Sequence, residues 1–354
     1  MSIEVFWRLP VNGDGRSFRQ EDWSRGDFRA PPSWGRSAFA RTEGRHERYT
    51  YFDHLGQVAR AAEFSGFDGV HIPQTAEGEE PLIVAGALAR ELKRVTLVPA
   101  LPAHFLSAVY AAKISTSFQR LTGGRLALNL VTEEPGEKPW HGYRWTVAEQ
   151  IARAGEFLDV LKGFWNDGPF TYHGQYYEVE NGGFAGPLKG QPLPTIYLSG
   201  DTDEALALSA RHADVHILAA EEIGVLSEKI ARLDALAYDH GRKLRYALDA
   251  EVIARHTDEE AWAYARSRWS EADGDFDALK LGPNLWSGFG ALRTGGPPAG
   301  LVGGYAEVAE LLADYRAAGI DTFILGANPH LEEAYRVGQH VLPRLRGQAA
   351  RDAA

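Results

Sequence analysis

The feature of this sequence that most constrains its fold is a regular alternation of two hydrophobic periodicities. Short runs of β-branched and aromatic residues alternate with longer stretches whose apolar residues recur at helical spacing, which is typical of repeated βα units. The eight predicted strands cover residues 3–9, 69–73, 95–100, 126–131, 195–199, 215–218, 246–254 and 322–325, and the predicted helices cover 51–65, 81–92, 107–121, 148–165, 203–212, 222–240 and 304–318. Eight parallel strands with intervening helices close naturally into a (β/α)8 TIM-type barrel without exposed sheet edges. We predict this α/β barrel, with an open doubly wound sheet as the less favoured alternative.

The length of 354 residues fits one such barrel with insertions. We predict a single domain over residues 1–346 and a flexible tail at 347–354. Three insertions are expected: 11–50 after the first strand, 165–194 before the fifth strand, and 272–303 between the seventh and eighth strands. The second insertion is predicted to contain a hairpin of 170–173 and 176–179. Loops that follow strands carry the active sites of barrel enzymes, so extra length there indicates function.

Composition and charge exclude several classes of protein. With 44% hydrophobic and 24% charged residues, the chain is predicted to bury a sizeable core. A net charge of -11 argues against nucleic-acid phosphate as the main partner. No apolar run of roughly 18 residues and no basic stretch followed by an apolar leader occur, so we expect neither a membrane span nor secretion. The absence of Cys excludes disulfides and thiolate metal sites, and we expect a cytoplasmic protein without a metal site.

An arginine-rich segment follows the first strand. Eight Arg between residues 15 and 50 alternate with Phe and Trp, and Asp and Glu are interspersed among them. The interspersed carboxylates argue against binding of nucleic acid. Tryptophans are poorly tolerated in a free solvated loop, so we predict an ordered arm over the barrel mouth or against a second subunit.

Several motifs occur in order along nearly the whole chain. They are residues 6–10 (FWRLP) with 13–15 (GDG), 121–125 (LTGGR) with 129–132 (NLVT), 241–243 (GRK), 283–288 (PNLWSG), 301–303 (LVG), and 329–334 (PHLEEA) with 336–338 (RVG). The ordered set resembles the bacterial luciferase-like flavin monooxygenases, and most closely the alkanesulfonate monooxygenases among them.

This resemblance implies a (β/α)8 barrel that takes reduced flavin mononucleotide (FMN) from a separate NAD(P)H-dependent flavin reductase. The flavin would react with dioxygen and oxygenate a small organic substrate through a flavin peroxide. In the sulfonate branch, cleavage of a carbon–sulfur bond gives an aldehyde and sulfite. The resemblance also implies a homodimer or homotetramer.

The predicted cofactor site lies at the ends of two strands. Ser199, Gly200, Asp201 and Thr202 end the fifth strand and open a helix, so their backbone N–H groups could cradle the flavin phosphate at the positive end of that helix. An ordinary N-cap by Asp201 or Thr202 is the alternative, and Asp201 adds a negative charge. The resemblance places Asn129 and Thr132, which close the fourth strand, beside the isoalloxazine ring; a polar strand terminus is the alternative.

The seventh strand carries two carboxylates where the sulfonate enzymes have an Arg and a His. Asp249 and Glu251 are two residues apart, so both side chains are predicted on one face of the strand, where they would repel a sulfonate. Such a pair would couple, raising one pKa, and could act as acid and base or receive a cation or sugar hydroxyls. In the alternative, the pair points to the helices or is neutralised by a neighbouring Arg.

Two further catalytic candidates follow the seventh and eighth strands. Arg293, in the loop before Gly295, could close over an anionic group of the substrate or the flavin peroxide, or it could be a solvated loop residue. His330 could relay protons, although a lone histidine is as often structural.

Aromatic and amide side chains at the barrel mouth are predicted to contact the substrate. Phe6, Trp7 and Trp140 would exclude water, with plain barrel packing as the alternative. The predicted substrate-binding residues are Trp7, Asn12, Asn328 and Trp140. Four positions depart from the family: Asn12 stands for a His, Gly78 for a Cys, Asn328 for a Tyr and Ile151 for a Tyr.

We therefore predict a two-component monooxygenase that uses reduced FMN and O2. The sequence leaves the substrate open between an organosulfonate and a sulfur-free hydroxylated or amino compound. A deazaflavin- or flavin-dependent oxidoreductase on the same barrel is an alternative function, and a non-catalytic homologue that binds flavin or another ligand is a second.

Overall fold

The computed structural model describes residues 3–11, 51–75, 78–103, 106–132, 145–166, 168–269, 274–292 and 296–352. The predicted site residues Asn12, Trp140 and Arg293, and the arm at 15–50, lie outside the described residues. The chain divides into two compact units, which we describe separately. Unit 1 comprises Met1–Val95, Leu218–Lys229 and Tyr246–Ala354, and unit 2 comprises Thr96–Ile217 and Ile230–Arg245.

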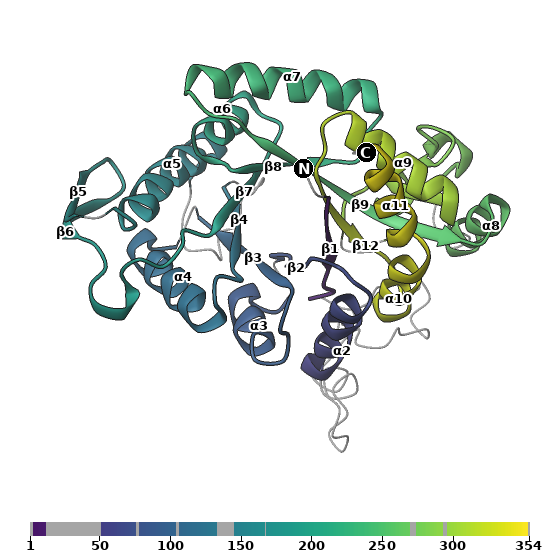
Figure 1. The fold of residues 1–354 in the computed structure, drawn as a ribbon. Coiled ribbons are helices and arrows are strands. Elements are labelled where there is room, and N and C mark those ends of the chain that lie inside the picture. Colours follow the sequence, from purple (N-terminus) through teal and green to yellow (C-terminus); the bar gives the residue numbers. More distant parts are fainter. Residues whose placement is uncertain are drawn as a thin grey trace, which may run out of the picture. The chain divides into compact units, whose positions relative to one another are not determined.

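Unit 1 is built on a mostly parallel sheet in the strand order β10-β11-β9-β12-β1-β2. The strands are β1 (Glu4–Arg8), β2 (Gly69–Ile72), β9 (Arg245–Arg255), β10 (Leu285–Trp286), β11 (Gly300–Gly304) and β12 (Thr322–Gly326). Only β10 is paired antiparallel among these strands. The described helices are α2 (Tyr51–Phe64), α3 (Pro81–Leu88), α8 (Asp258–Trp269), α9 (Tyr305–Ala317), α10 (His330–His340) and α11 (Leu342–Asp352). Helices α2 and α10 come from opposite ends of the chain and lie side by side (Figure 1).

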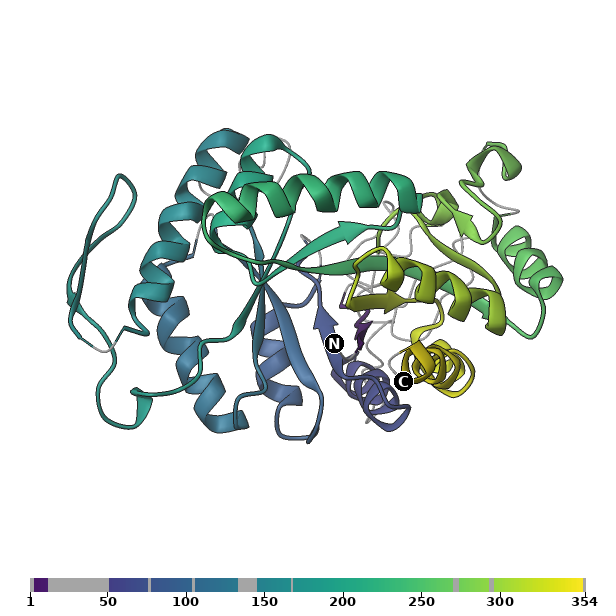
Figure 2. The ribbon, with the colours of Figure 1, turned by 45° about the horizontal axis from the view of Figure 1, so that its top comes forward.

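Unit 2 contains a parallel sheet in the order β3-β4-β7-β8. Its strands are β3 (Thr96–Pro102), β4 (Ala127–Val131), β7 (Thr195–Ser199) and β8 (Val215–Ala219), and its helices are α4 (Ala108–Thr122), α5 (Val147–Gly163) and α6 (Asp203–His212). Strand β8 and helix α7 (Ile223–Asp239) each run across the division between the units. An antiparallel hairpin of β5 (Phe170–His173) and β6 (Glu178–Gly182) extends beside α5 (Figure 2).

Local sequence signals fix several of these boundaries. Helix α5 begins with a capping box, in which Thr146 and Glu149 each bond the other's backbone N–H. Helix α4 begins at the N-cap Ser107 and ends at Gly123, whose φ of 69° is left-handed and favours glycine. Such caps satisfy backbone groups that a helix end would otherwise leave without partners.

Each predicted strand and helix overlaps an observed one, and the differences lie in the insertions and at the C-terminus. The second hairpin strand begins at Glu178 and not at 176. The stretch 272–303, predicted to be irregular, contains β10 and the start of β11. Helix α8, which precedes it, is strongly charged and gave no clear helical periodicity. At the C-terminus, where a flexible tail is predicted from residue 347, α11 continues to Asp352.

A cluster of aromatic residues holds the described part of this insertion. Trp286 of β10 is fully buried, and its ring lies 4.8 Å from that of Phe276 and 5.6 Å from that of Trp269 in α8. Burying large aromatic rings against one another stabilises a segment that has little backbone pairing of its own. Among the described helices, none is both long and apolar enough to cross a membrane.

Candidate active site

A buried arginine at the end of β1 joins the two carboxylates of β9. Arg8 donates from Nη1 to Glu251 Oε1 at 2.5 Å, and from Nη2 to Asp249 Oδ1 and to the carbonyl oxygen of Ala250 at 3.3 Å. The side chains of Arg8 and Glu251 are 4% and 0% exposed, whereas that of Asp249 is 25% exposed. A cation from a neighbouring strand therefore lies between the carboxylates, as in the alternative with a neighbouring Arg, and the repulsion of a sulfonate stays a prediction.

Arg8 stays positively charged although it is buried. Burial by itself would lower the pKa of the guanidinium, but the charges of Asp249 and Glu251 and their hydrogen bonds raise it above its ordinary value. An arginine fork suits this arrangement because its two terminal nitrogens can serve two carboxylates at once. Arg8 is thus a permanent positive charge in the interior of unit 1.

Two glycines make room for this ion pair. Strand β12 lies between β1 and β9, and its last residue, Gly326, is in register with Glu251. A Cβ atom on Gly326 would lie 2.5 Å from Arg8 Nη1 and 3.1 Å from its Cζ, so any side chain there would obstruct the arginine as it crosses β12. A Cβ atom on Gly296 would overlap both Glu251 Oε1 and Arg8 Nη1. Glycine is therefore needed at both positions while Arg8 reaches β9.

A buried histidine completes what we call the ion cluster: Arg8, His71, Asp249 and Glu251. His71 of β2 is in register with Arg8 and is 5% exposed. Burial lowers the pKa of His71 to about 4, against an opposing effect of Asp249 and with a smaller contribution from Arg8. The imidazole is neutral at pH 7, so one positive and two negative charges leave the cluster with one net negative charge.

The structure places His330 away from this cluster. His330 is the first residue of α10, and its side chain is 2% exposed. Its ring lies 6.0 Å from the ring of Trp7, which also packs edge-on against Phe67 at 5.2 Å. Successive side chains of a strand point to opposite faces, so Trp7 and His330 lie on the face of β1 that is turned away from Arg8. The surroundings of Trp7 and His330 fit the packing alternatives, and a catalytic role of His330 and a substrate contact of Trp7 stay predictions.

Asn328, a predicted substrate-binding residue, lies between the end of β12 and His330. It is partly buried, and its backbone carbonyl accepts a hydrogen bond from the Tyr264 hydroxyl at 3.4 Å. The peptide bond between Asn328 and Pro329 is cis. A role of Asn328 in substrate binding stays a prediction.

The predicted cofactor residues lie together at one edge of the unit 2 sheet. Strands β4 and β7 are parallel neighbours, with Asn129 in register with Tyr197, so their carboxyl ends meet at the same edge. Asn129 is partly buried and Thr132 is 3% exposed, whereas Ser199 is exposed. Crevices at the carboxyl ends of parallel strands are where ligands bind in α/β proteins.

The turn from Ser199 to Thr202 combines features that favour and oppose an anion. Gly200 has a φ of 122°, which L side chains rarely adopt. Thr202 is the N-cap of α6, and its Oγ1 accepts from the Ala205 N–H at 3.2 Å. The capping alternative therefore holds for Thr202, and it leaves the exposed helix N-terminus open to a phosphate.

Carboxylates at 201, 203 and 204 oppose an anion at this turn. One of them is offset, because Asp203 pairs with Arg232 at 2.7 Å. The residues fit a flavin phosphate through their backbone N–H groups and not through side-chain charge.

Helix α5 anchors two loops of unit 2, which the sequence reasoning missed. Arg153 donates to the carbonyl oxygens of Ala103 and Leu106, after β3, at 2.9 and 3.0 Å. Tyr177 donates from its hydroxyl to the same Leu106 carbonyl at 2.9 Å, and burial raises its pKa to about 12 against the effect of Arg153. Glu156, one turn further along α5, accepts from the backbone N–H groups of 175, 176 and 177 at 2.7, 2.8 and 3.1 Å. The one feature of the sequence that could have indicated these contacts is the spacing of Arg153 and Glu156, which lie three residues apart on one face of α5.

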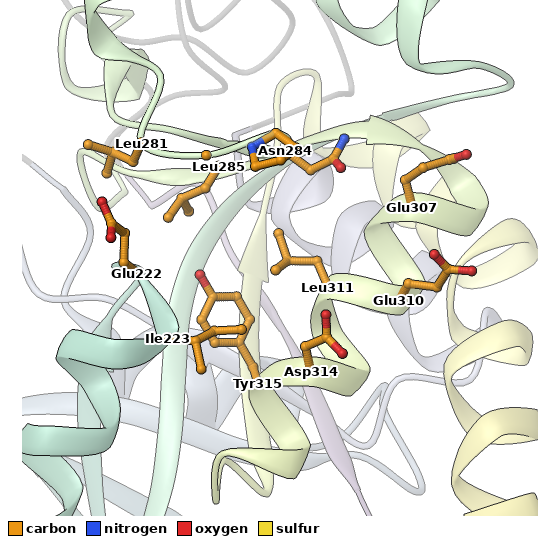
Figure 3. A pocket seen from close by; sticks show the side chains of 12 residues that line it. Glu222, Ile223, Leu281, Asn284, Leu285, Glu307, Glu310, Leu311, Asp314 and Tyr315 are labelled. Carbon is orange, nitrogen blue, oxygen red and sulfur yellow. The ribbon is translucent and has the colours of Figure 1, made fainter.

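A separate acidic pocket of about 370 Å³ lies in unit 1 between α9, the start of α7 and the segment before β10 (Figure 3). Apolar residues form its walls, among them Leu281, Leu285 and Leu311, and its carboxylates are those of Glu222, Glu307, Glu310 and Asp314. Tyr315 lies between Glu222 and Asp314 and donates from its hydroxyl to the Glu221 carbonyl at 2.7 Å. Of the predicted site residues that the structure describes, none lines this pocket.

The motif at 283–288 borders the pocket and has a structural role. Asn284 donates from Nδ2 to Asp258 Oδ1 and to the Val302 carbonyl, both at 3.0 Å. The same Asp258 oxygen accepts from the Gly304 N–H at 2.7 Å. These bonds connect the start of α8 to β11. The motif at 283–288 therefore stabilises the fold in this part of the chain.

The family model for luciferase-like monooxygenases matches residues 34–322. The chain therefore belongs to the luciferase-like monooxygenase family. This family membership confirms the broader part of the resemblance drawn from the sequence motifs.

Solved structures confirm the predicted TIM-type α/β barrel fold. A long-chain alkane monooxygenase is 16% identical, with a TM-score of 0.74, covering 99% of this chain and 92% of its own. The oxygenating constituent of 3,6-diketocamphane monooxygenase from Pseudomonas putida, in complex with FMN, is 20% identical, with a TM-score of 0.66 and coverages of 98% and 99%. An F420-dependent secondary alcohol dehydrogenase is 16% identical, also with a TM-score of 0.66 and coverages of 98% and 99%.

Proposed function

We propose that this protein is the oxygenating component of a two-component monooxygenase, which uses reduced FMN and O2 to oxygenate a small organic substrate. The observation that carries the proposal is the match of residues 34–322 to the luciferase-like monooxygenases. The FMN complex of the diketocamphane enzyme and the exposed turn at 199–202 support FMN as the cofactor.

The cofactor residues have distinct proposed roles. The backbone N–H groups of the turn from Ser199 to Thr202 would hold the FMN phosphate at the N-terminus of α6. Asn129 and Thr132 would contact the isoalloxazine ring from the end of β4. When bound, reduced FMN supplies the electrons and activates dioxygen, while the protein supplies position and excludes water. Arg153 would keep the segment after β3 fixed beside that edge through its two carbonyl bonds.

The reaction that follows from the resemblance to the alkanesulfonate monooxygenases is cleavage of an organosulfonate to an aldehyde and sulfite. Oxygenation of a sulfur-free hydroxylated or amino compound is the competing form of the same chemistry. A deazaflavin-dependent oxidoreductase is a second candidate function, which the F420-dependent dehydrogenase favours. An NAD(P)H-dependent flavin reductase as partner, a homodimer or homotetramer, and a cytoplasmic location belong to the same proposal.

The decisive experiment measures oxygen uptake, hydrogen peroxide and sulfite release with photochemically reduced FMN. The panel contains linear, sugar and amino sulfonates and their sulfur-free analogues. Free reduced FMN consumes O2 and forms hydrogen peroxide without any substrate, so a compound that lowers the peroxide formed per O2 consumed supports the monooxygenase, and sulfite with aldehyde identifies the desulfonating form. A peroxide yield that no compound lowers, together with anaerobic oxidation of an alcohol by oxidised deazaflavin, would refute it.

A matched pair of variants tests the phosphate site separately. Gly200→Ala and Gly190→Ala both place a side chain at a positive φ, of 122° and 79°, but only Gly200 lies in the proposed site. Gly200→Ala is expected to weaken FMN binding about tenfold or more in a fluorescence titration, while Gly190→Ala leaves it unchanged. Equal FMN affinities of the two variants would place the phosphate elsewhere.

A further inference from the structure

The three charged members of the ion cluster differ in how far water can reach them. Glu251 and Arg8 are sealed, with 0% and 4% of their side chains exposed, while Asp249 keeps 25%. Glycines 296 and 326 lie directly against the Arg8–Glu251 contact, which leaves no space for a ligand there. Among the charged members of the cluster, all of which the structure describes, Asp249 is the one that a small molecule in unit 1 can reach.

The charge that a ligand would meet at Asp249 is negative. Arg8 is shared between two carboxylates, and His71, the fourth member, is neutral at pH 7. The remaining nitrogen of the guanidinium, Arg8 Nε, is buried, so an anionic ligand cannot reach it from solvent. The cluster thus offers an acceptor and one net negative charge, and no accessible positive charge.

The orientation of Asp249 is fixed by its ion pair. Arg8 Nη2 binds Oδ1, while Oδ2 takes no hydrogen bond from the residues that the structure describes. An ionised oxygen in a partly buried place forms stronger hydrogen bonds with charged donors than with neutral ones. The preferred partner of such an oxygen is a compact cation with several N–H donors, such as a protonated amine.

We propose that Asp249 is the residue that determines substrate specificity, and that it binds a protonated amino group of the substrate. Arg8 acts as a positioning residue that holds the Asp249 carboxylate, and Glu251 shares the charge of Arg8, so the two carboxylates together keep one net negative charge. This inference rests on the proposed function, since it names the substrate class of that monooxygenase. It favours the amino compound over the sulfonate, because a sulfonate beside Asp249 would be repelled.

The test is a binding measurement that needs neither flavin nor oxygen. Hexylammonium, hexanol and hexanesulfonate share one alkyl chain and differ in the charge of the head group. Their affinities for the wild-type protein are measured by isothermal titration calorimetry at pH 7. We expect hexylammonium to bind at least about tenfold more tightly than hexanesulfonate, the ratio given by one charge-assisted hydrogen bond.

Three variants assign this preference to Asp249. Asp249→Asn is expected to reduce the ammonium-to-sulfonate ratio about tenfold, whereas Asp239→Asn, which removes the same charge from the exposed end of α7, leaves the ratio unchanged. Arg8→Lys keeps the net charge but cannot serve both carboxylates with one fork, so it should lower the ratio through misplacement of Asp249. A purely structural role of Arg8 would change the melting temperature and not the ratio.

Two results would overturn the inference. One is that hexanesulfonate binds the wild-type protein as tightly as hexylammonium, which needs no variant to fold. The other is an Asp249→Asn protein with the wild-type ratio. Oxygenation of sulfonates alone would refute this specificity while the proposed monooxygenase stands. An ammonium preference without any flavin-dependent oxygenation of a substrate would refute the monooxygenase and leave the site.

Discussion

Removal of the guanidinium of Arg8 is the strongest test of how this structure holds its buried charges. Arg8→Met keeps the length of the side chain and leaves Glu251 ionisable, 0% exposed and without its cation. Deleting one partner of a buried ion pair costs about 3–5 kcal/mol, because the other charge stays buried. The pair with Asp249 adds at most about 1 kcal/mol, since that carboxylate is 25% exposed and can rehydrate. We therefore expect the free energy of unfolding to fall by about 3–5 kcal/mol.

The measurement is urea unfolding followed by tryptophan fluorescence, for which the nine Trp residues provide the signal. The double variant Arg8→Met/Glu251→Leu removes both buried charges and is expected to recover most of the loss, because apolar replacements of a buried pair are often neutral. A loss below about 1 kcal/mol in Arg8→Met would refute the reasoning. A double variant no more stable than the single one would refute it as well, because the cost would then not come from the stranded carboxylate.

Three further predictions concern His71, two glycines and Glu156. The folded-state pKa of His71 is about 4 and lies below its unfolded value near 6.5. The free energy of unfolding of the wild-type protein should therefore fall by up to about 3 kcal/mol as the pH drops from 6.5 to 4. In His71→Gln, the urea midpoint should decline less over the same pH range. Gly326→Ala should lower the free energy of unfolding by about 1–3 kcal/mol through its clash with Arg8, whereas Gly86→Ala, in open space on α3, should raise it by about 0.5–1 kcal/mol. Similar effects of the two variants in urea unfolding would contradict the passage of Arg8 across β12 at Gly326. Glu156→Ala should accelerate amide hydrogen exchange at 175–177 and leave α6 unchanged; full protection there would show that Glu156 does not anchor the hairpin.

The strands and helices were predictable because they depend on the spacing of apolar residues along the sequence. Apolar periodicity and caps such as Ser107 and Thr146 depend on residues a few positions apart, so the sequence places these elements within a few residues. Motifs at fixed offsets likewise indicated the family, and the edge formed by β4 and β7 follows from their parallel order. Among the elements that the sequence did not predict, α8, β10 and β11 depend on the packing of Trp286 with distant aromatic rings.

Within the site, local spacing predicts which residues share a face of one strand. The spacing of Asp249 and Glu251 placed both carboxylates together, as the structure has them. It could not identify their counter-ion, because Arg8 lies more than 240 positions away and reaches them only across β12 at Gly326. The tertiary structure also decided that His330 packs with Trp7 on the other face of β1. Charge pairing of this kind depends on strand order and on the space left by glycines, which are properties of long-range packing and not of local periodicity.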